Sequence, residues 1–527
     1  MNAALASAAP VAEDKYKYKY LIAIAVTMAA MLELIDTSIV NVAIPHMMGN
    51  LGATLDEISW VSVGYIIANV IVIPMSSWLS AYFGRKRYLT ASILLFVAAS
   101  FFCGASTTLV QLVVWRVIQG IGGGALLSTA QSTLWEAFPP HEVGIGQAMF
   151  GVGVMVGPTL GPTLGGYIVD NWNWPWIFYI NLPLGLIAAA MVWTYVTDSE
   201  HQERADKVDW LGIGLLTVAV GSLQWMLERG ERYDWFESKF VTGLLVTTIV
   251  SFAWLVWHEL HTDEPVIDFH LLKNRQLATG VLMGSLLGFA LFGSVFVLPI
   301  FLQSLHGFTA NQTGMVILPG AIASALTMAI MGRRLRLLPD GRPVIFLGAS
   351  LFMVCMWKLS LLSFDSGGSD LFWPLIMRGV ALGMIFIPLN SIALAELAPR
   401  DLAQGTGLFN LMRQLGGSMG IAIMATMLSR FTAQKKGLLT EHMVAIAPDV
   451  QARLAGLTHA LMAKGASASV AHQQALMVMD RSVGAQASVL AFSRIYWISG
   501  IALMCATPMM LLWHSGRPRG LPANSGH

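Results

Sequence analysis

One run of apolar residues decides what kind of fold this chain can adopt: YLIAIAVTMAAMLELIDTSIVNVAI, residues 20 to 44. A helix crosses the hydrocarbon core of a membrane with about 20 apolar residues. The run is too long for the core of a secretory signal peptide, and no cleavage site of the A-x-A type follows it. We therefore predict a first membrane span that the mature protein keeps.

The composition extends this prediction to the whole chain. Of its 527 residues 55% are hydrophobic and 12% are charged, whereas soluble domains carry about 25% charged residues. A polytopic, all-α membrane protein is expected. The net charge of +1 argues against a nucleic-acid partner, because such binding needs a basic surface. The three cysteines lie in apolar segments without paired or metal-binding spacing, so free thiols are expected.

Fourteen segments satisfy the same length rule. They are residues 20–44, 58–80, 88–106, 109–134, 143–168, 176–197, 209–227, 240–258, 277–304, 311–332, 343–363, 371–395, 402–429 and 491–513. An even number places both termini on one side of the membrane. Basic residues cluster on that side, which the positive-inside rule makes cytoplasmic; they include Lys15, Lys17, Lys19, Arg85, Lys86, Arg87, Lys273, Arg275, Arg333, Arg334, Arg336, Arg342, Arg517 and Arg519. The tryptophans of NWNWPW, residues 171–176, are expected to form an interfacial belt on the outer side.

The two halves of the chain resemble each other. WEAFPPHEVGIG (135–146) and AELAPRDLAQGTG (395–407) share a glutamate, a proline three residues later and a Gly-x-Gly. We predict a cytoplasmic tail (1–19), a six-helix N-terminal half (20–197), two inserted helices with loops (198–276), a six-helix C-terminal half (277–513) and a cytoplasmic tail (514–527). Parallel repeats of this kind place a substrate site at their interface.

No cofactor is predicted. The chain has no Gly-Lys pair and so no P-loop, and its glycine-rich stretches lie in membrane spans and follow no strand. The histidines lack metal-binding spacing, so no metal is expected. For uphill transport the remaining energy source is the membrane gradient, about 2.3 kcal/mol per charge per 100 mV.

Two acids in the first span, Glu33 and Asp36, are the strongest signal of chemistry. They lie on nearly the same helix face, about 4.5 Å apart along the axis. Low dielectric penalises both charges and each penalises the other, so they are expected to titrate as a coupled pair. The alternative is a structural role, in which they pair with an arginine or with backbone donors. Function is favoured, because intramembrane acids are costly and mark ion pathways.

Four motifs connect the chain to a family: LIDTSIVNVAIP (34–45), RVIQGIGGG (116–124), GVMVGPTLGPTLGG (153–166) and WPWIFYINLPLG (174–185). Together they resemble spans one, four, five and six of the major facilitator superfamily, in particular its fourteen-span drug:proton antiporters of the EmrB type. The resemblance covers about residues 20 to 513. It implies the major facilitator fold and a transporter rather than an enzyme.

The loop SWLSAYFGRK (77–86) departs from the family pattern, which has glycine and aspartate where this chain has Ser77 and Ala81. The gating role that the resemblance implies therefore falls on the retained Gly84 and Arg85.

The resemblance also places Asp36 and Arg116 on the proton route, and Glu33 joins them on physical grounds alone. A guanidinium stays charged, so it can alter the proton affinity of a nearby carboxyl as helices move. The alternative for Arg116 is a purely structural link between spans four and one. Arg378 and Arg413 in the second half are open to both readings.

Span five carries the residues of the antiporter motif: Gly153, Gly157, Pro158, Gly161, Pro162 and Gly165. Glycines let a neighbouring helix backbone approach closely, and prolines bend a helix. A tightly packed helix at the interface between the halves would suit a rocking motion with little proton leak. Ordinary close packing is the alternative.

The substrate cavity is predicted to involve Glu33, Trp60, Tyr65, Asn69 and Arg378. Methionine and aromatic side chains suit an adaptable apolar cavity for hydrophobic drugs. Residues 430–490 form a long outer segment in which VQARLAGLTHALMAKG reads as an amphipathic helix. One reading is a cap that lies on the helix bundle or in the lipid headgroups. The other is a docking surface for a periplasmic membrane-fusion adaptor that leads to an outer-membrane channel.

The resulting prediction is a proton-driven multidrug efflux antiporter of the bacterial inner membrane, working by alternating access within a tripartite pump and able to confer antibiotic resistance. Two alternatives remain open. One is a proton-linked importer of a nutrient or osmolyte, and the other is a membrane sensor that transports nothing.

Overall fold

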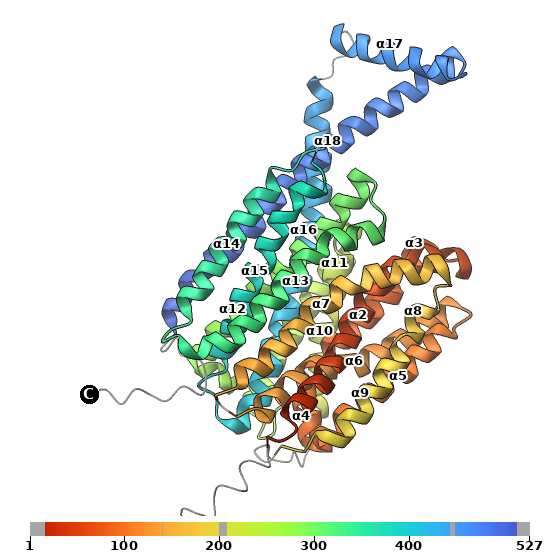
Figure 1. Cartoon of the computed structure of the whole chain (residues 1–527). Coiled ribbons are helices and arrows are strands. Elements are labelled where there is room, and N and C mark those ends of the chain that lie inside the picture. The colour runs from red at the N-terminus through yellow and green to blue at the C-terminus, as the bar shows by residue number, and fades with distance from the viewer. Residues whose placement is uncertain (1–15, 140, 200–207, 365, 443–447, 514–527) are drawn as a thin grey trace, which may run out of the picture.

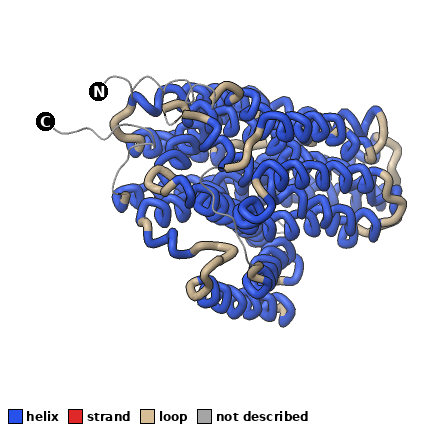
Figure 2. The backbone as a smooth tube through the Cα atoms, turned by 90° about the horizontal axis from the view of Figure 1, so that it is seen from below, coloured by secondary structure: helices blue, strands red, loops and turns tan. Residues whose placement is uncertain are grey.

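The computed structural model describes residues 16–139, 141–199, 208–364, 366–442 and 448–513. Within these ranges the chain consists of helices and loops, without a strand (Figure 2). This confirms the predicted all-helical class. Most of the predicted tails, residues 1–15 and 514–527, lies outside the described residues.

The first half of the chain forms one group of packed helices. These are α2 (Lys19–Leu51), α3 (Leu55–Ile58), α4 (Trp60–Phe83), α5 (Arg85–Gly104), α6 (Leu109–Ala137), α7 (Val143–Asn171), α8 (Trp176–Tyr179) and α9 (Asn181–Tyr195). Helix α2 lies against α7, α6 and α9, while α6 packs between α4 and α5. The polar face of α2 is thereby turned into the protein rather than toward lipid.

The second half forms a similar group. It contains α12 (Arg275–His306), α13 (Ala310–Arg334), α14 (Arg342–Ser360), α15 (Gly368–Ala393), α16 (Leu402–His442), α17 (Pro448–Ala463) and α18 (Ala468–Ala506). Helix α12 packs on α16, and α15 packs between α13 and α14. The two groups meet where α7 runs beside α13 and where α16 lies against α4 and α6 (Figure 1).

Thirteen helices of the described part are long and apolar enough to cross a membrane. The fourteenth predicted span, 402–429, lies in α16, which is a continuous helix of the bundle. Its sequence LAQGTGLFNLMRQLGGSMG contains many glycines and polar residues, because α16 is surrounded by other helices and not by lipid alone. The helix exists, but its composition alone does not mark it as a span.

The two inserted helices, α10 (Trp210–Arg229) and α11 (Lys239–Glu259), form a hairpin that touches both halves. Gln224 Nε2 on α10 donates to Ser418 Oγ on α16 at 3.0 Å, and Arg229 Nη2 donates to Ser59 Oγ at 2.7 Å. Helix α11 packs on α10 and exposes most of its apolar side chains. The hairpin therefore straddles the junction of the halves.

The segment 430–490 stands away from the bundle as a helical arm. Helix α16 continues past the bundle, α17 crosses the far end, and α18 returns (Figure 1). This confirms the helix predicted from VQARLAGLTHALMAKG, and α17 does not lie on the bundle as a cap. At the base of the arm α16 packs on α18, and an exposed ion pair of 2.8 Å joins Lys436 Nζ to Asp480 Oδ1.

Two other predictions concern the ends of the helices. The start of α2 and the end of α18 lie at the same end of the bundle, opposite α17 (Figure 1); which side faces the cytoplasm remains a prediction. Of the predicted tryptophan belt, Trp172 and Trp176 are exposed, but Trp174 is buried against Phe178. Two of the three side chains are therefore exposed as the predicted belt requires, whereas the third fills the core; the belt itself stays a prediction.

Candidate functional site

Asp36 lies at the centre of a buried polar network in the first half. Its side chain has no solvent exposure. Its Oδ2 accepts a hydrogen bond from Arg116 Nη1 at 2.5 Å, and its Oδ1 accepts from Gln119 Nε2 and Asn181 Nδ2, both at 2.9 Å. Asp36 lies on α2, and its three partners come from α6 and α9. A buried charge is tolerated only when it is paired and hydrogen-bonded, and Asp36 meets both conditions.

Arg116 is held equally firmly. Its Nε donates to the carbonyl oxygen of Val61 at 3.0 Å, and its Nη1 also donates to Gln119 Oε1 at 2.7 Å. Its guanidinium carbon lies 4.1 Å from the centroid of the Tyr65 ring, a cation–π contact in a dry environment. The guanidinium thus links α6 to α2 and to α4.

Glycines explain why α6 can bring Arg116 so close to α4. A Cβ added at Gly120 would lie 2.5 Å from the Tyr65 carbonyl oxygen, and one added at Gly124 would lie 2.5 Å from the Asn69 carbonyl oxygen. Both separations are shorter than atoms tolerate. The GIGGG sequence after Arg116 is therefore a packing surface, as is common for small residues between membrane helices.

Glu33 has a different environment from Asp36, although only three residues separate them. Its Oε1 accepts from Asn69 Nδ2 at 2.9 Å, while its Oε2 is buried without a hydrogen-bond partner among the described residues. Across the interface it interacts electrostatically with Arg413 on α16. Its Oε2 can therefore accept a hydrogen bond or bind a proton.

The motif glycines of α7 all face α2, the helix that carries both acids. Added Cβ atoms would lie 2.5 Å from Thr27 Cγ2 at Gly153, 2.9 Å from Leu34 Cβ at Gly157, 3.0 Å from Ile39 N at Gly161 and 2.8 Å from Ile39 Cγ1 at Gly165. Pro158 and Pro162 lie inside the same helix.

The opposite side of α7 approaches α13 just as closely. A Cβ added at Gly144 would lie 2.5 Å from the carbonyl oxygen of Gly332. Helix α7 therefore packs closely on α2 of its own half on one side and on α13 of the other half on the opposite side.

Gly84 and Arg85 stabilise the end of the bundle where the chain begins. Gly84 has φ 85°, which favours glycine, and Lys86 N donates to Asp198 Oδ1 at 2.9 Å. Arg85 Nη2 bonds Glu136 Oε1 at 2.6 Å. These contacts join helices of the first half to one another, so any gating role remains a proposal.

The structure gathers some predicted cavity residues and separates others. Glu33, Tyr65 and Asn69 lie together beside the Asp36–Arg116 pair. Trp60 instead packs on Trp225 of the inserted hairpin, with ring centroids 5.2 Å apart. Arg378 is buried in the second half, within electrostatic reach of Cys355 and Tyr496.

Several residues that complete the site escaped the sequence analysis. Gln119 lies one turn after Arg116, so helix periodicity could have found it. Asn181 is the polar residue inside WPWIFYINLPLG, a weaker signal. Intramembrane amides also bridge the two halves: Gln131 Nε2 donates to Asn390 Oδ1 at 2.8 Å, and Asn410 Nδ2 donates to Gln131 Oε1 at 2.7 Å.

Carboxyl and guanidinium groups can hold charge, and a carboxyl group can bind a proton, so the network contains the groups that the predicted proton route needs. Among the described residues no group of His, Cys, Asp and Glu could hold a metal ion. The three cysteines are free, as predicted.

Comparisons with known proteins agree with this architecture. The human organic anion transporter MFSD10 has the same fold, with a TM-score of 0.59 and 13% identity over 92% of this chain and 99% of that one. The proton:xylose symporter XylE also matches at a TM-score of 0.59, with 13% identity over 95% and 98% of the two chains. At these identities they show the fold alone.

Relatives in sequence are closer. The multidrug export protein EmrB of Escherichia coli strain K12 is 34% identical over 507 residues, which are 95% of this chain and 96% of that protein. The fatty acid resistance protein FarB of Neisseria gonorrhoeae is 30% identical over 93% of this chain and 96% of its own length. The Major Facilitator Superfamily profile matches residues 26–421. The chain therefore belongs to the major facilitator superfamily, as a multi-pass membrane transporter of the EmrB-like group.

Proposed function

We propose that this transporter exports hydrophobic and amphipathic drugs from a bacterial cell in exchange for protons. The names of its relatives, which export drugs or give resistance to fatty acids, support the direction of transport. The observation that carries the proposal is the buried Asp36–Arg116 pair, with 2.5 Å between Oδ2 and Nη1, beside Glu33, whose Oε2 accepts no hydrogen bond from the described residues. The bacterial inner membrane is the corresponding location.

In this proposal the two acids have different roles: Asp36 controls the contact between α2 and α6, and Glu33 binds either a proton or a cationic substrate. Asp36 accepts three hydrogen bonds and is sealed from solvent in this conformation. A proton reaching Asp36 would cancel its attraction to Arg116 and release α6 from α2. Glu33 lies at the junction of the halves, and its Oε2, which has no hydrogen-bond partner in the described part of the chain, would be the atom for which a proton and a cationic substrate compete.

The conformational change would use the contacts of α7 and the amide bridges. Helix α7 is packed against α2 by glycines and against α13 in the other half, so a shift of α2 would be passed across the interface. The bonds from Gln131 to Asn390 and Asn410 join the halves and would have to break when they rock apart. Each buried amide left without a partner costs about 1–3 kcal/mol, so these bridges would stabilise the present state.

The test is transport in vesicles made from the purified protein and loaded with a fluorescent cationic dye. With an imposed proton gradient, export that a protonophore stops is the expected result. Protonophore-sensitive accumulation would establish the importer instead, and no flux of any candidate compound in either direction would support the sensor. Proton release measured on adding each compound identifies the coupled ones.

The helical arm is proposed to dock a periplasmic adaptor, which would extend the pump toward an outer-membrane channel. It projects beyond the bundle, and no residue of α17 is buried. Because α16 and α18 pack on each other below the arm, residues 440–476 can be replaced by a short linker without separating the helices. The shortened protein should fold and transport in vesicles, while adaptor capture from membranes is lost. Unchanged capture would exclude the arm as the docking surface.

A further inference from the structure

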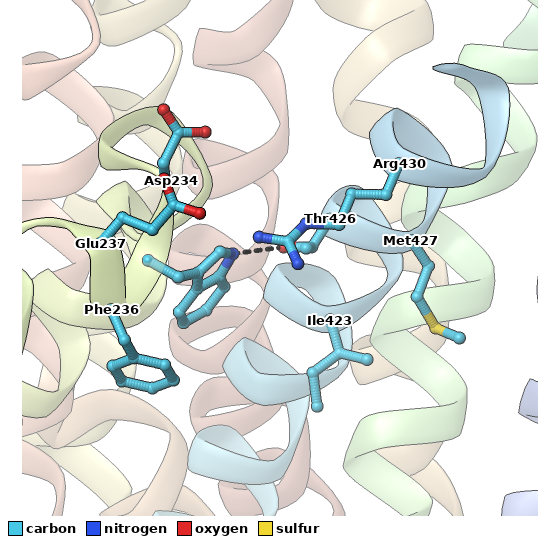
Figure 3. A pocket seen from close by; sticks show the side chains of 8 residues that line it. Asp234, Phe236, Glu237, Ile423, Thr426, Met427 and Arg430 are labelled. Atoms are coloured by element: carbon cyan, nitrogen blue, oxygen red, sulfur yellow. Dashed lines mark hydrogen bonds between the residues drawn. The ribbon is translucent and has the colours of Figure 1, made fainter. Parts of the chain in front are cut away.

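A pocket of about 560 Å³ lies far from the buried acids, where the tip of the inserted hairpin meets α16. Two short helical turns, η1 (Glu231–Tyr233) and η2 (Trp235–Glu237), form the tip. Figure 3 shows Asp234, Phe236 and Glu237 on the hairpin side, and Ile423, Thr426, Met427 and Arg430 on the α16 side. The second set recurs every three or four residues, so it forms one continuous stripe of α16.

The indole of Trp235 joins the two walls. Its Nε1 donates to Thr426 Oγ1 at 2.9 Å and to Glu231 Oε2 at 3.2 Å. Asp234 and Trp235 have φ values of 52° and 51°, in the left-handed region that residues other than glycine rarely adopt. This backbone turns the indole inward and leaves the carboxylates of Asp234 and Glu237 at the rim. The bonded indole holds the strained turn in place.

The rim of the pocket carries charged side chains of opposite sign on its two walls. Asp234 and Glu237 are exposed on one wall and Arg430 is exposed on the other. Within the described part of the chain, none of the three forms an ion pair or a side-chain hydrogen bond. Below them the lining is apolar, with Phe236 59% exposed and Ile423 38% exposed. The pocket is thus an apolar groove under a dipolar rim.

The pocket is expected at the boundary between membrane and water, because it lies at one end of two predicted spans. The apolar helices α10 and α11 end at this tip, and Tyr233, Trp235, Phe236 and Phe240 cluster there. Aromatic side chains concentrate at the headgroup level of a bilayer. A ligand here would have an apolar part along Phe236, Ile423 and Met427, and a head that carries both charges.

We propose that this pocket binds a zwitterionic phospholipid with a primary ammonium group. The phosphate would pair with Arg430, the ammonium would donate to Asp234 and Glu237, and an acyl chain would cover the apolar lining. A quaternary ammonium head cannot donate hydrogen bonds to the carboxylates, and an anionic head would face two like charges. The lipid would fasten the hairpin to α16, a role separate from export.

The experiment measures lipid retention by native mass spectrometry on the purified full chain. Phosphatidylethanolamine, phosphatidylcholine and phosphatidylglycerol with identical acyl chains are titrated separately. Phosphatidylethanolamine should bind about tenfold more tightly than either of the others. Arg430→Gln should reduce that binding about tenfold. The double variant Asp234→Asn with Glu237→Gln should instead favour phosphatidylglycerol, because only the positive charge remains.

The matched control is Arg481→Gln, which removes an exposed arginine from the arm and should change nothing. Equal retention of the three lipids, no retention at all, or indifference to the variants would overturn the proposal and leave only non-specific boundary lipid. Tighter binding of a single-chain quaternary ammonium amphiphile would also overturn it, because the groove would then be a drug contact. Unchanged thermal unfolding of each variant separates lost binding from lost folding.

Discussion

The two halves of the transporter use the same packing but different charges. In the first half, Gly157 and Gly161 let α7 touch α2. In the second half, Gly416 and Gly420 of α16 let it touch α12, because a Cβ on either would collide with the carbonyl oxygen of Ser285 or Phe289. Close helix contact of this kind is therefore a property of both halves.

The two halves differ, however, in how their buried arginines are paired. Arg116 has Asp36 as a partner at 2.5 Å. Arg378 and Arg413 are also buried, but in the described part of the chain neither forms an ion pair; Arg413 donates instead to Asn410 Oδ1 at 3.0 Å. The comparison teaches that both halves can support movement by close helix packing, whereas the buried ion pair and both acids proposed for proton coupling lie in the first half.

The largest effect is expected from Asp36→Asn. Without the carboxylate, protonation can no longer weaken the contact with Arg116, so proton-driven efflux should fall at least about 100-fold. Dye export from vesicles measures it, at matched protein content. Leaving one buried partner unpaired costs about 3–5 kcal/mol, so the control is Asp36→Asn combined with Arg116→Met, which should recover thermal stability but not transport. Normal efflux by the single variant would remove Asp36 from the mechanism.

The glycine contacts are the next most sensitive. Gly161→Val would force side-chain atoms into Ser38 and the backbone of Ile39, so export should fall about tenfold or more. Gly420→Val should have an effect of similar size if the two halves move as equivalents. Gly243→Val, where a Cβ would meet nothing within 4 Å, is the matched control. A defect at Gly161 but not at Gly420 would mean that only the first half needs close packing.

Glu33→Gln should reduce export of cationic substrates more than export of neutral ones. The amide keeps the size of the side chain but loses the negative charge, so export of cationic dyes should fall about tenfold and that of neutral compounds less. Initial efflux rates for a cationic and a neutral dye of similar size provide the measurement. Equal losses for both would point to a structural role for Glu33.

The smallest change is expected from the bridge between the halves. Gln131→Leu leaves Asn390 without its donor and Asn410 without its acceptor, so the present conformation should lose about 1–3 kcal/mol. Thermal unfolding should report the loss, and the efflux rate should change by no more than about fivefold. Ser222→Ala, which removes a buried hydroxyl contact to Thr248 within the inserted hairpin, is the control that leaves the half-to-half interface intact. Unchanged unfolding would show that the bridge contributes nothing.

The sequence by itself determined the class of fold and the most conspicuous charges. Length and hydropathy are local properties, so the spans could be read from residues close together in the chain. The cost of burying charge singled out Glu33 and Asp36 in the same way, and the family resemblance added Arg116.

Only the tertiary structure decided which of these groups meet. Asp36 pairs with Arg116, 80 residues away, and with Asn181, 145 residues away. Such pairings arise from helix packing and leave no periodic signal in the chain. For the same reason the sequence treated Glu33 and Asp36 as one coupled pair. In the folded chain Asp36 accepts from three donors, while Oε2 of Glu33 has no hydrogen-bond partner among the residues that the structure describes.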